Sequence, residues 1–221
     1  MTKFTRWSGI AHSILAKSHR KLKLGHAQEI LAAYLGHRTY ASLRMHDLAA
    51  LQDQAKYVLI DPGMALNRAS SLDIQLTADD WHSVEMALKP SGVSGNTWLV
   101  GEPSMHLAAT LTFEDSCDQR LSDIGHLIGM IDGYRAKDTR CHSSHGELPD
   151  ELKFTVEGEV RAIGAKAYLA VPVVCEITFP RIGNRFYASG ELLSVKQSGQ
   201  PKEYEPEEHE SDFPFLSESG D

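Results

Sequence analysis

Four side chains in the middle of the chain are of the types that hold a zinc ion: Cys117, Cys141, His142 and His145. Cysteine sulfur and histidine nitrogen are the ligands that zinc prefers in tetrahedral sites. Their spacing matches no standard zinc finger, and the sequence contains no Cys-x-x-Cys pair. Two interpretations stay open, a zinc site or a polar loop with solvated histidines. We favour the second, which needs no cofactor.

Two groups of acidic residues have the chemistry for general acid–base catalysis. Asp79, Asp80 and His82 lie at the expected start of a helix, where acids commonly stabilise the helix dipole. Glu157 and Glu159 share one face of an expected strand, as solvated carboxylates often do. Neither group has a recognisable catalytic partner, and the sequence lacks a Gly-x-Ser-x-Gly elbow, a Walker loop and a dinucleotide-binding fingerprint. The sequence therefore favours a protein that is not an enzyme.

Positive charge is concentrated near the start of the chain and negative charge near its end. The formal net charge of −8 divides into +7 for residues 1–45, −8 for residues 46–200 and −7 for residues 201–221. A basic surface contacts phosphates with salt-dependent affinity and without choice of sequence. The candidate contact residues for a nucleic acid or another partner are Arg20, Lys21, Lys23, Arg38 and Arg44. The alternative is a solvated helix face that has no partner.

The acidic segment 201–221 has no hydrophobic periodicity, and we expect it to be a disordered tail. It contains Asp212, Phe213, Pro214 and Phe215, which are similar to the acidic, Pro-Phe-ended tip of bacterial single-strand DNA-binding proteins. In that family the tip recruits partner proteins and ends at its final Phe, whereas six residues follow Phe215 here. An acidic segment with two aromatic rings can dock in a basic-rimmed apolar pocket. These four residues are therefore a candidate docking segment.

The helices and strands expected to position these residues form an α+β protein in three parts. They are a small all-helical basic module over residues 1–60, an α+β domain with a mostly antiparallel sheet over residues 71–200, and the tail 201–221. In the module, hydrophobic periodicity predicts helices over residues 5–19, 26–35 and 39–54. Gly36 ends the second helix and Thr39 caps the third. Asp61-Pro62-Gly63 predicts a turn at a domain edge.

In the second part, strands and helices are predicted in turn. Alternation predicts strands over residues 72–76, 98–100, 107–113, 154–161, 168–179 and 185–196, and helical spacing predicts helices over residues 77–88 and 117–131. Residues 137–150 are polar and predict a loop. Gly183-Asn184 predicts a hairpin turn, and Pro172 interrupts its strand or places it at a sheet edge.

One stretch of the module resembles a known family. Residues 14–44, ILAKSHRKLKLGHAQEILAAYLGHRTYASLR, resemble the small helical module of proteobacterial glyoxalase-related proteins, which also occurs in hypothetical proteins of plasmids and integrative elements. The family's pattern falls on His26, Glu29, Leu31, Gly36, Arg38, Tyr40 and Leu43, with His37 where the family usually has an aromatic residue. The resemblance implies a compact helical module in a bacterial protein, and it carries no chemistry over to these residues.

Cysteine content and hydropathy predict the compartment. Three cysteines are an odd and sparse set, which argues against a disulfide scaffold and for a reducing environment. The longest stretch without charge or strong polarity, residues 167–175, is far shorter than the about 20 residues of a membrane-spanning helix. We therefore expect a cytoplasmic protein that does not cross a membrane.

Together these features predict a non-enzymatic bacterial accessory protein of mobile-element type. It would bind a protein or a nucleic acid through its basic helical module and its acidic tail. One alternative is a metal-dependent enzyme of glyoxalase-like type, with His and Glu ligands in residues 71–200. Another is a single-stranded nucleic-acid-binding protein that stacks bases on the strand aromatics Phe154, Tyr168, Phe179, Phe186 and Tyr187.

Overall fold

The computed structural model describes residues 2–88, 98–101, 104–117, 130–142, 148–163 and 168–204, and in them the chain is an α+β protein with a large antiparallel sheet, as expected. The helices are α1 (Lys3–Ser18), α2 (Leu24–Tyr34), α3 (Tyr40–His46), α4 (Leu48–Asp53), α5 (Pro62–Ser71), α6 (Ala78–Leu88) and α7 (Ser104–Ser116). The strands are β1 (Tyr57–Leu59), β2 (Trp98–Val100), β3 (Met130–Cys141), β4 (Glu151–Ile163), β5 (Tyr168–Pro180), β6 (Phe186–Tyr187), β7 (Glu191–Gln197) and β8 (Lys202–Glu203).

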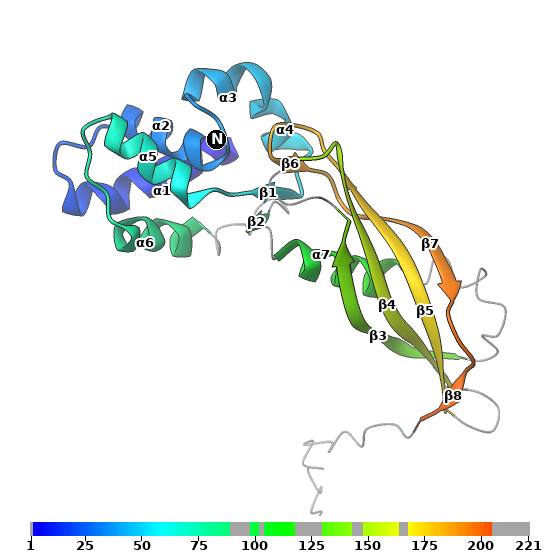
Figure 1. Cartoon of the computed structure of the whole chain (residues 1–221). Coiled ribbons are helices and arrows are strands. Elements are labelled where there is room, and N and C mark those ends of the chain that lie inside the picture. Colours follow the sequence, from blue (N-terminus) through cyan, green and yellow to red (C-terminus); the bar gives the residue numbers. More distant parts are fainter. Residues whose placement is uncertain are drawn as a thin grey trace, which may run out of the picture.

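The elements form a helical part and a sheet part, joined by a small second sheet (Figure 1). Helices α1 to α6 pack together at one end of the molecule. Strand β1 pairs in parallel with β2 and antiparallel with β6 in the small sheet. The large sheet has the order β3-β4-β5-β7, with β8 also paired to β5, and α7 lies against it.

The helical part is built on amphipathic helices whose aromatic residues meet in one core. Phe4, Trp7 and Leu15 of α1 are buried, at the spacing that places them on one face of a helix. The Phe4 ring stacks on Tyr40 with ring centroids 4.8 Å apart. Tyr34 at the end of α2 meets Trp81 of α6 edge to face at 5.1 Å. These contacts join α1 to α3 and α2 to α6.

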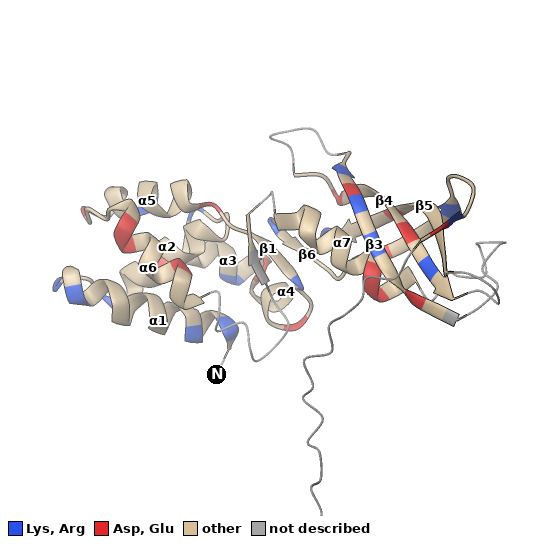
Figure 2. Ribbon diagram, turned by 90° about the horizontal axis from the view of Figure 1, so that it is seen from below, with Lys and Arg blue, Asp and Glu red and all other residues tan. Residues whose placement is uncertain are grey.

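The large sheet has one buried face and one charged face. Alternate residues of β4, including Leu152, Phe154 and Val156, are buried against α7 and the neighbouring strands. Acidic and basic residues are interspersed along the strands of the large sheet in Figure 2. On that charged face Glu159 pairs with Lys137 and, at 3.1 Å, with Arg161. A strand with one buried face has a fixed register, because a one-residue slip would bury these charges.

The connection from β5 to β6 reaches into the helical part. The backbone N–H of Asn184 donates to Asp47 Oδ2 at 2.8 Å, and the Asn184 side-chain amide donates to the carbonyl of Gly36 at 2.5 Å. Arg185 Nη2 lies 3.2 Å from Asp61 Oδ2. Phe186 is buried in the core of the helices. Residues from the second half of the chain therefore complete the core of the first half.

Segment 107–113, expected as a strand, is part of helix α7. Met105, Ala108, Ala109, Thr112 and Phe113 are the buried residues of α7, and their spacing of three and four is helical. Leu107 and Leu111 are exposed, so their alternation with Ala109 and Phe113 does not reflect a buried strand face. The strand prediction was wrong because apolar residues occur on both the buried and the exposed side of this helix.

Three other expectations are corrected by the hydrogen-bonding pattern, and a fourth is tested only at its ends. Segment 72–76 forms no strand, and its Leu72, Ile74 and Leu76 pack on the helical core after α5 ends. Residues 137–141 belong to strand β3, because they pair with β4 instead of forming a loop. The expected strand 185–196 is two strands in different sheets, β6 on β1 and β7 on β5. Residues 118–129 of the expected helix 117–131 lie outside the described residues, and Ile131 is in β3.

The ends of the helices agree only in part with the capping and turn signals in the sequence. Thr39 caps α3 through its Oγ1, which accepts the Ser42 N–H at 3.1 Å, but the expected helix 39–54 is divided at Asp47 into α3 and α4. Asp61-Pro62 starts helix α5, because Asp61 Oδ1 accepts the Met64 N–H at 3.1 Å and proline fits the first turn of a helix. The sheet continues past Gln200, through β8 to Tyr204.

Candidate functional site

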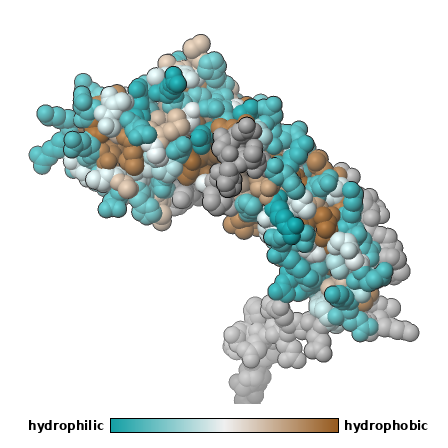
Figure 3. All heavy atoms as spheres, in the orientation of Figure 1, coloured by the Kyte–Doolittle hydropathy of each residue, from teal (hydrophilic) through white to brown (hydrophobic). Residues whose placement is uncertain are grey.

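Three of the five predicted contact residues lie on the turn between α1 and α2. Arg20, Lys21 and Lys23 are exposed there, and Lys17 is exposed in the last turn of α1. This end of the molecule, on the left in Figures 1 and 3, is mainly hydrophilic. These four cationic residues lie within residues 17–23, at the end of α1 and on the turn that follows it. We call Lys17, Arg20, Lys21 and Lys23 the turn cluster.

Two histidines hold the backbone of this turn in place. His12 Nε2 on α1 donates to the carbonyl of Leu22 at 3.2 Å. His26 Nδ1 on α2 accepts the Lys23 N–H at 3.4 Å. The buried Leu22 side chain adds an apolar anchor between the two. The turn cluster therefore projects from an ordered backbone, which lowers the conformational entropy lost when a ligand binds.

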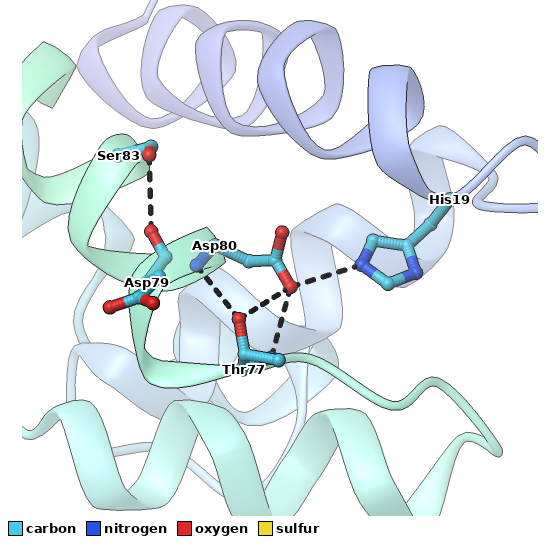
Figure 4. A network of polar contacts seen from close by, with 5 residues as sticks. All are labelled: His19, Thr77, Asp79, Asp80 and Ser83. Carbon is cyan, nitrogen blue, oxygen red and sulfur yellow. Dashed lines mark hydrogen bonds and ion pairs between the residues drawn. The ribbon is translucent and has the colours of Figure 1, made fainter.

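A third histidine ties the turn to α6 (Figure 4). Asp80 Oδ2 accepts hydrogen bonds from the Thr77 backbone N–H at 3.0 Å and the Thr77 hydroxyl at 2.8 Å, and it lies 3.3 Å from His19 Nε2. The hydrogen bonds from Thr77, with a smaller contribution from His19, lower the pKa of Asp80. Asp80 is therefore ionised near neutral pH and holds the end of α1 against α6. This carboxylate, one of the candidate acid–base residues, caps a helix.

The other two predicted contact residues lie at the opposite end of α2. Arg38 follows Gly36, whose φ of +89° turns the chain after α2, and Arg44 lies on α3. Both side chains are exposed. Helix α2 has eleven residues between the two groups, so its rise of 1.5 Å per residue separates them by about 16 Å. The five residues thus form two groups, here called the two basic sites: three residues that precede α2 and two that follow it, Arg38 after Gly36 and Arg44 on α3.

Charge pairing distinguishes these five cations from several arginines of the rest of the chain. Among the residues that the structure describes, none of the five makes an ion pair. Arginines that do make one include Arg68, Arg140, Arg161, Arg181 and Arg185. Glu29, the acidic residue of segment 1–45, pairs with Arg68 at 2.6 Å. The predicted contact residues therefore have their charges available to a partner.

The proposed zinc ligands do not come together in the described part of the chain. Cys117 is buried beside the thiol of Cys175, which raises the pKa of Cys175, and burial adds to this shift. Cys141 ends β3, and the exposed His142 Nε2 lies 2.6 Å from Thr155 Oγ1. His145 lies outside the described residues. No three His, Cys, Asp or Glu side chains among those described are grouped so as to hold a metal ion.

The carboxylates on the large sheet are engaged in ion pairs. Glu157 Oε1 lies 3.2 Å from Arg140 Nη2. Burial raises the pKa of Glu159, but the hydrogen bonds and charges of Lys137 and Arg161 outweigh it and hold that pKa below its ordinary value. His82, near the other acidic group, is exposed on α6. These residues stabilise the charged face of the sheet and the start of α6.

The strand aromatics offer little surface for stacking bases. Phe154, Phe179, Phe186 and Tyr187 are buried in the two cores. Tyr168 is partly exposed and packs against Tyr204 at 5.7 Å. The candidate docking residues Asp212, Phe213, Pro214 and Phe215 lie outside the described residues.

Comparison with known proteins gives no assignment. No family model, curated protein or solved structure matches this chain. The described helices include none that is long and apolar enough to cross a bilayer. A proposal about function therefore rests on the geometry of the two basic sites and of the residues that hold them.

Sequence reasoning missed the residues that hold the two basic sites. His12, His19 and His26 occur at intervals of seven residues, and that regular spacing was the available signal. His37 and Asp47 hold the other site, with His37 Nε2 2.9 Å from Asp47 Oδ2. The spacing of His37 and Asp47 in the sequence does not predict this contact, because the position of the Asp47 carboxylate also depends on its hydrogen bond from the distant Asn184.

Proposed function

We propose that this protein is a nucleic-acid-binding accessory protein of mobile-element type, whose helical module contacts the phosphate backbone. The contacts are made by Arg20, Lys21 and Lys23 at one end of α2 and by Arg38 and Arg44 at the other. The observation that supports this proposal is that all five cations are exposed and make no ion pair with the described residues, unlike Arg68 and the paired arginines of the sheet part.

The separation of the two basic sites indicates how the contact is made. Sites about 16 Å apart, as the rise of α2 gives, reach different phosphate groups. Arginine and lysine contacts to phosphate position a protein on the backbone and do not read the base sequence. We therefore propose binding that depends on charge and tolerates many sequences.

Salt dependence gives the proposal a quantitative form. Each neutralised phosphate on duplex DNA contributes about −0.9 to the slope of log K against log salt. Five contacts give a slope of about −4.5, which corresponds to an affinity loss of roughly 500-fold between 50 and 200 mM salt. Removal of two contacts reduces the steepness of the slope by about 1.8.

The test uses the full chain, a fluorescein-labelled DNA duplex and anisotropy titrations between 50 and 200 mM KCl. Arg20→Gln/Lys21→Gln and Arg38→Gln/Arg44→Gln each remove two charges from one basic site. The matched control, Lys196→Gln/Lys202→Gln, removes two exposed charges from β7 and β8. We expect weaker binding and a shallower salt slope for each of the first two variants, and wild-type values for the control.

Two outcomes contradict the proposal. Equal losses in the control and in the two module variants would mean that net charge alone governs binding. Absence of binding to duplex and single-stranded DNA and RNA at 50 mM salt would exclude nucleic acid as the partner. Retention of one acidic protein by the wild type, lost in both module variants, would then assign the same cations to a protein partner.

A further inference from the structure

Three side chains near the end of α2 form a continuous polar contact. His37 Nδ1 lies 3.2 Å from Ser42 Oγ, and His37 Nε2 lies 2.9 Å from Asp47 Oδ2, off the line of an ideal hydrogen bond. The three residues occur at intervals of five in the chain, and α3 brings them together because it begins between His37 and Ser42 and ends next to Asp47. Hydroxyl, imidazole and carboxylate in this order are the groups of a nucleophile, its base and an orienting acid.

The surroundings keep His37 in the form that accepts a proton. Its side chain is 4% exposed, and burial lowers the pKa of His37 although the charge of Asp47 opposes the shift. A neutral imidazole carries one proton, and the carboxylate beside Nε2 favours that nitrogen for it. The lone pair on Nδ1 then faces the hydroxyl of Ser42.

Asp47 is itself held in place. Its Oδ2 accepts the Asn184 N–H at 2.8 Å, and its side chain is 8% exposed. The hairpin that carries Asn184 therefore fixes the carboxylate, and the carboxylate in turn fixes the ring of His37. A base that is oriented by a fixed third group is the arrangement that activates serine nucleophiles.

The hydroxyl of Ser42 is not used for folding of the helix. The cap of α3 is supplied by Thr39, whose Oγ1 accepts the Ser42 N–H at 3.1 Å, and the hydroxyl of Ser42 contacts His37. Ser42 is also partly exposed, whereas His37 and Asp47 are buried. Of the three residues, Ser42 is thus the one that is not fully buried.

We propose that Ser42 is a nucleophile that accepts an acyl group from a carboxylic ester, with His37 as its base and Asp47 as the residue that positions His37. The Ser42 Oγ attacks the ester carbonyl carbon as its proton passes to His37 Nδ1. The carbon–oxygen bond to the leaving alcohol then breaks, and that alcohol takes the proton from His37. The product is an acyl-serine, which water hydrolyses by the same proton transfers in reverse. This activity goes beyond the binding proposed above and does not depend on it.

The first test treats the full chain with a fluorophosphonate probe, which labels activated serines, and locates the adduct by peptide mass spectrometry. We expect one adduct on Ser42, none in Ser42→Ala, and at least a tenfold slower reaction in His37→Gln with an unchanged circular dichroism spectrum. Ser71, whose hydroxyl donates to the Arg68 carbonyl at 2.7 Å, is the internal control and stays unlabelled. Equal labelling of Ser42 and Ser71 contradicts the proposal.

A second test does not require an ester substrate or an intact serine. In Ser42→Cys, His37 beside the new thiol favours its thiolate, so iodoacetamide should alkylate the thiol introduced by this substitution at least ten times faster than the partly exposed Cys141 at pH 7. The advantage should be lost in Ser42→Cys/His37→Gln. A role limited to packing predicts similar rates in both variants, so that result, or absence of Ser42 labelling by the fluorophosphonate, overturns the proposal.

Discussion

Substitution of Gly36 by alanine should destabilise the protein through two separate effects. The φ of +89° at Gly36 is in the left-handed region, which costs a residue with a Cβ about 1–2 kcal/mol. An added Cβ would also overlap Arg185 Cδ and lie 2.8 Å from Nε, so the Arg185 side chain must move. Arg185 would then lose its 3.2 Å contact with Asp61 and the packing of its stem, a further loss of about 1 kcal/mol for a part-exposed pair.

The expected total for Gly36→Ala is about 2–3 kcal/mol in the free energy of unfolding. Urea unfolding followed by circular dichroism measures it, and with a slope of about 2–3 kcal/mol per molar urea the midpoint should fall by about 1 M. Gly9→Ala is the matched control, because Gly9 lies in α1 and an added Cβ has no neighbour within 4 Å. That control should be neutral or slightly stabilising, since alanine has the higher helix propensity.

A double-mutant cycle separates the backbone effect from the side-chain effect. In an Arg185→Ala background the three atoms nearest to the Cβ at position 36 are removed, so mainly the backbone cost of about 1–2 kcal/mol should remain. The two substitutions should therefore be less than additive by about 1 kcal/mol. Full additivity would refute the close approach of Arg185, and a Gly36→Ala loss under about 0.5 kcal/mol would refute the left-handed turn as well.

Two further predictions concern buried ionisable side chains, those of Glu159 and His37. Glu159→Gln should lower the free energy of unfolding at pH 7 by about 1–3 kcal/mol, because it removes the acceptor of Lys137 and Arg161. Folding lowers the pKa of Glu159, so its contribution is present above its ordinary pKa of 4.5 and is lost as the pH falls through the lower value of the folded state. The melting curves of both proteins should therefore converge as the pH is lowered below 4.5, and a constant gap would contradict the ion pairs. Burial lowers the pKa of His37, and the charge of His46 lowers it further, although the charge of Asp47 opposes the shift. The unfolded chain therefore binds the proton more readily than the folded protein. The free energy of unfolding should fall as the pH drops below 6.5. His37→Gln should lose that part of the slope below pH 6.5, and an unchanged slope would mean that folding does not lower the pKa of His37.

The helical part was the part of the fold that the sequence predicted best. The periodicity of α1, α2 and α6 has a single apolar face, and Gly36 and Thr39 carry local signals whose physics involves only neighbouring residues. The turn after α2 and the cap of α3 were therefore predicted at the correct residues. Local chemistry is sufficient where the partner atoms are a few residues apart.

Prediction failed where distant segments decide the structure. The run 107–113 alternates as a strand would, and only the packing of α7 on the sheet shows that Leu107 and Leu111 are the exposed residues. Strand β6 has two residues and pairs with β1, so nothing near it in the sequence separates it from β7. The candidate contact residues were chosen by charge alone, whereas their division into two groups depends on the course of α2.

The hairpin between β5 and β6 has a consequence for synthesis on the ribosome. Phe186 belongs to the core of α1–α6, yet it follows the end of α6 by about a hundred residues. At the usual translation rates of about 5–20 residues per second, the nascent helices wait roughly 5–20 s for it. During that interval the space that Phe186 will fill and the backbone partners of β1 are open to other chains. Nascent-chain chaperones should therefore be most important for this protein between the emergence of α6 and that of β6.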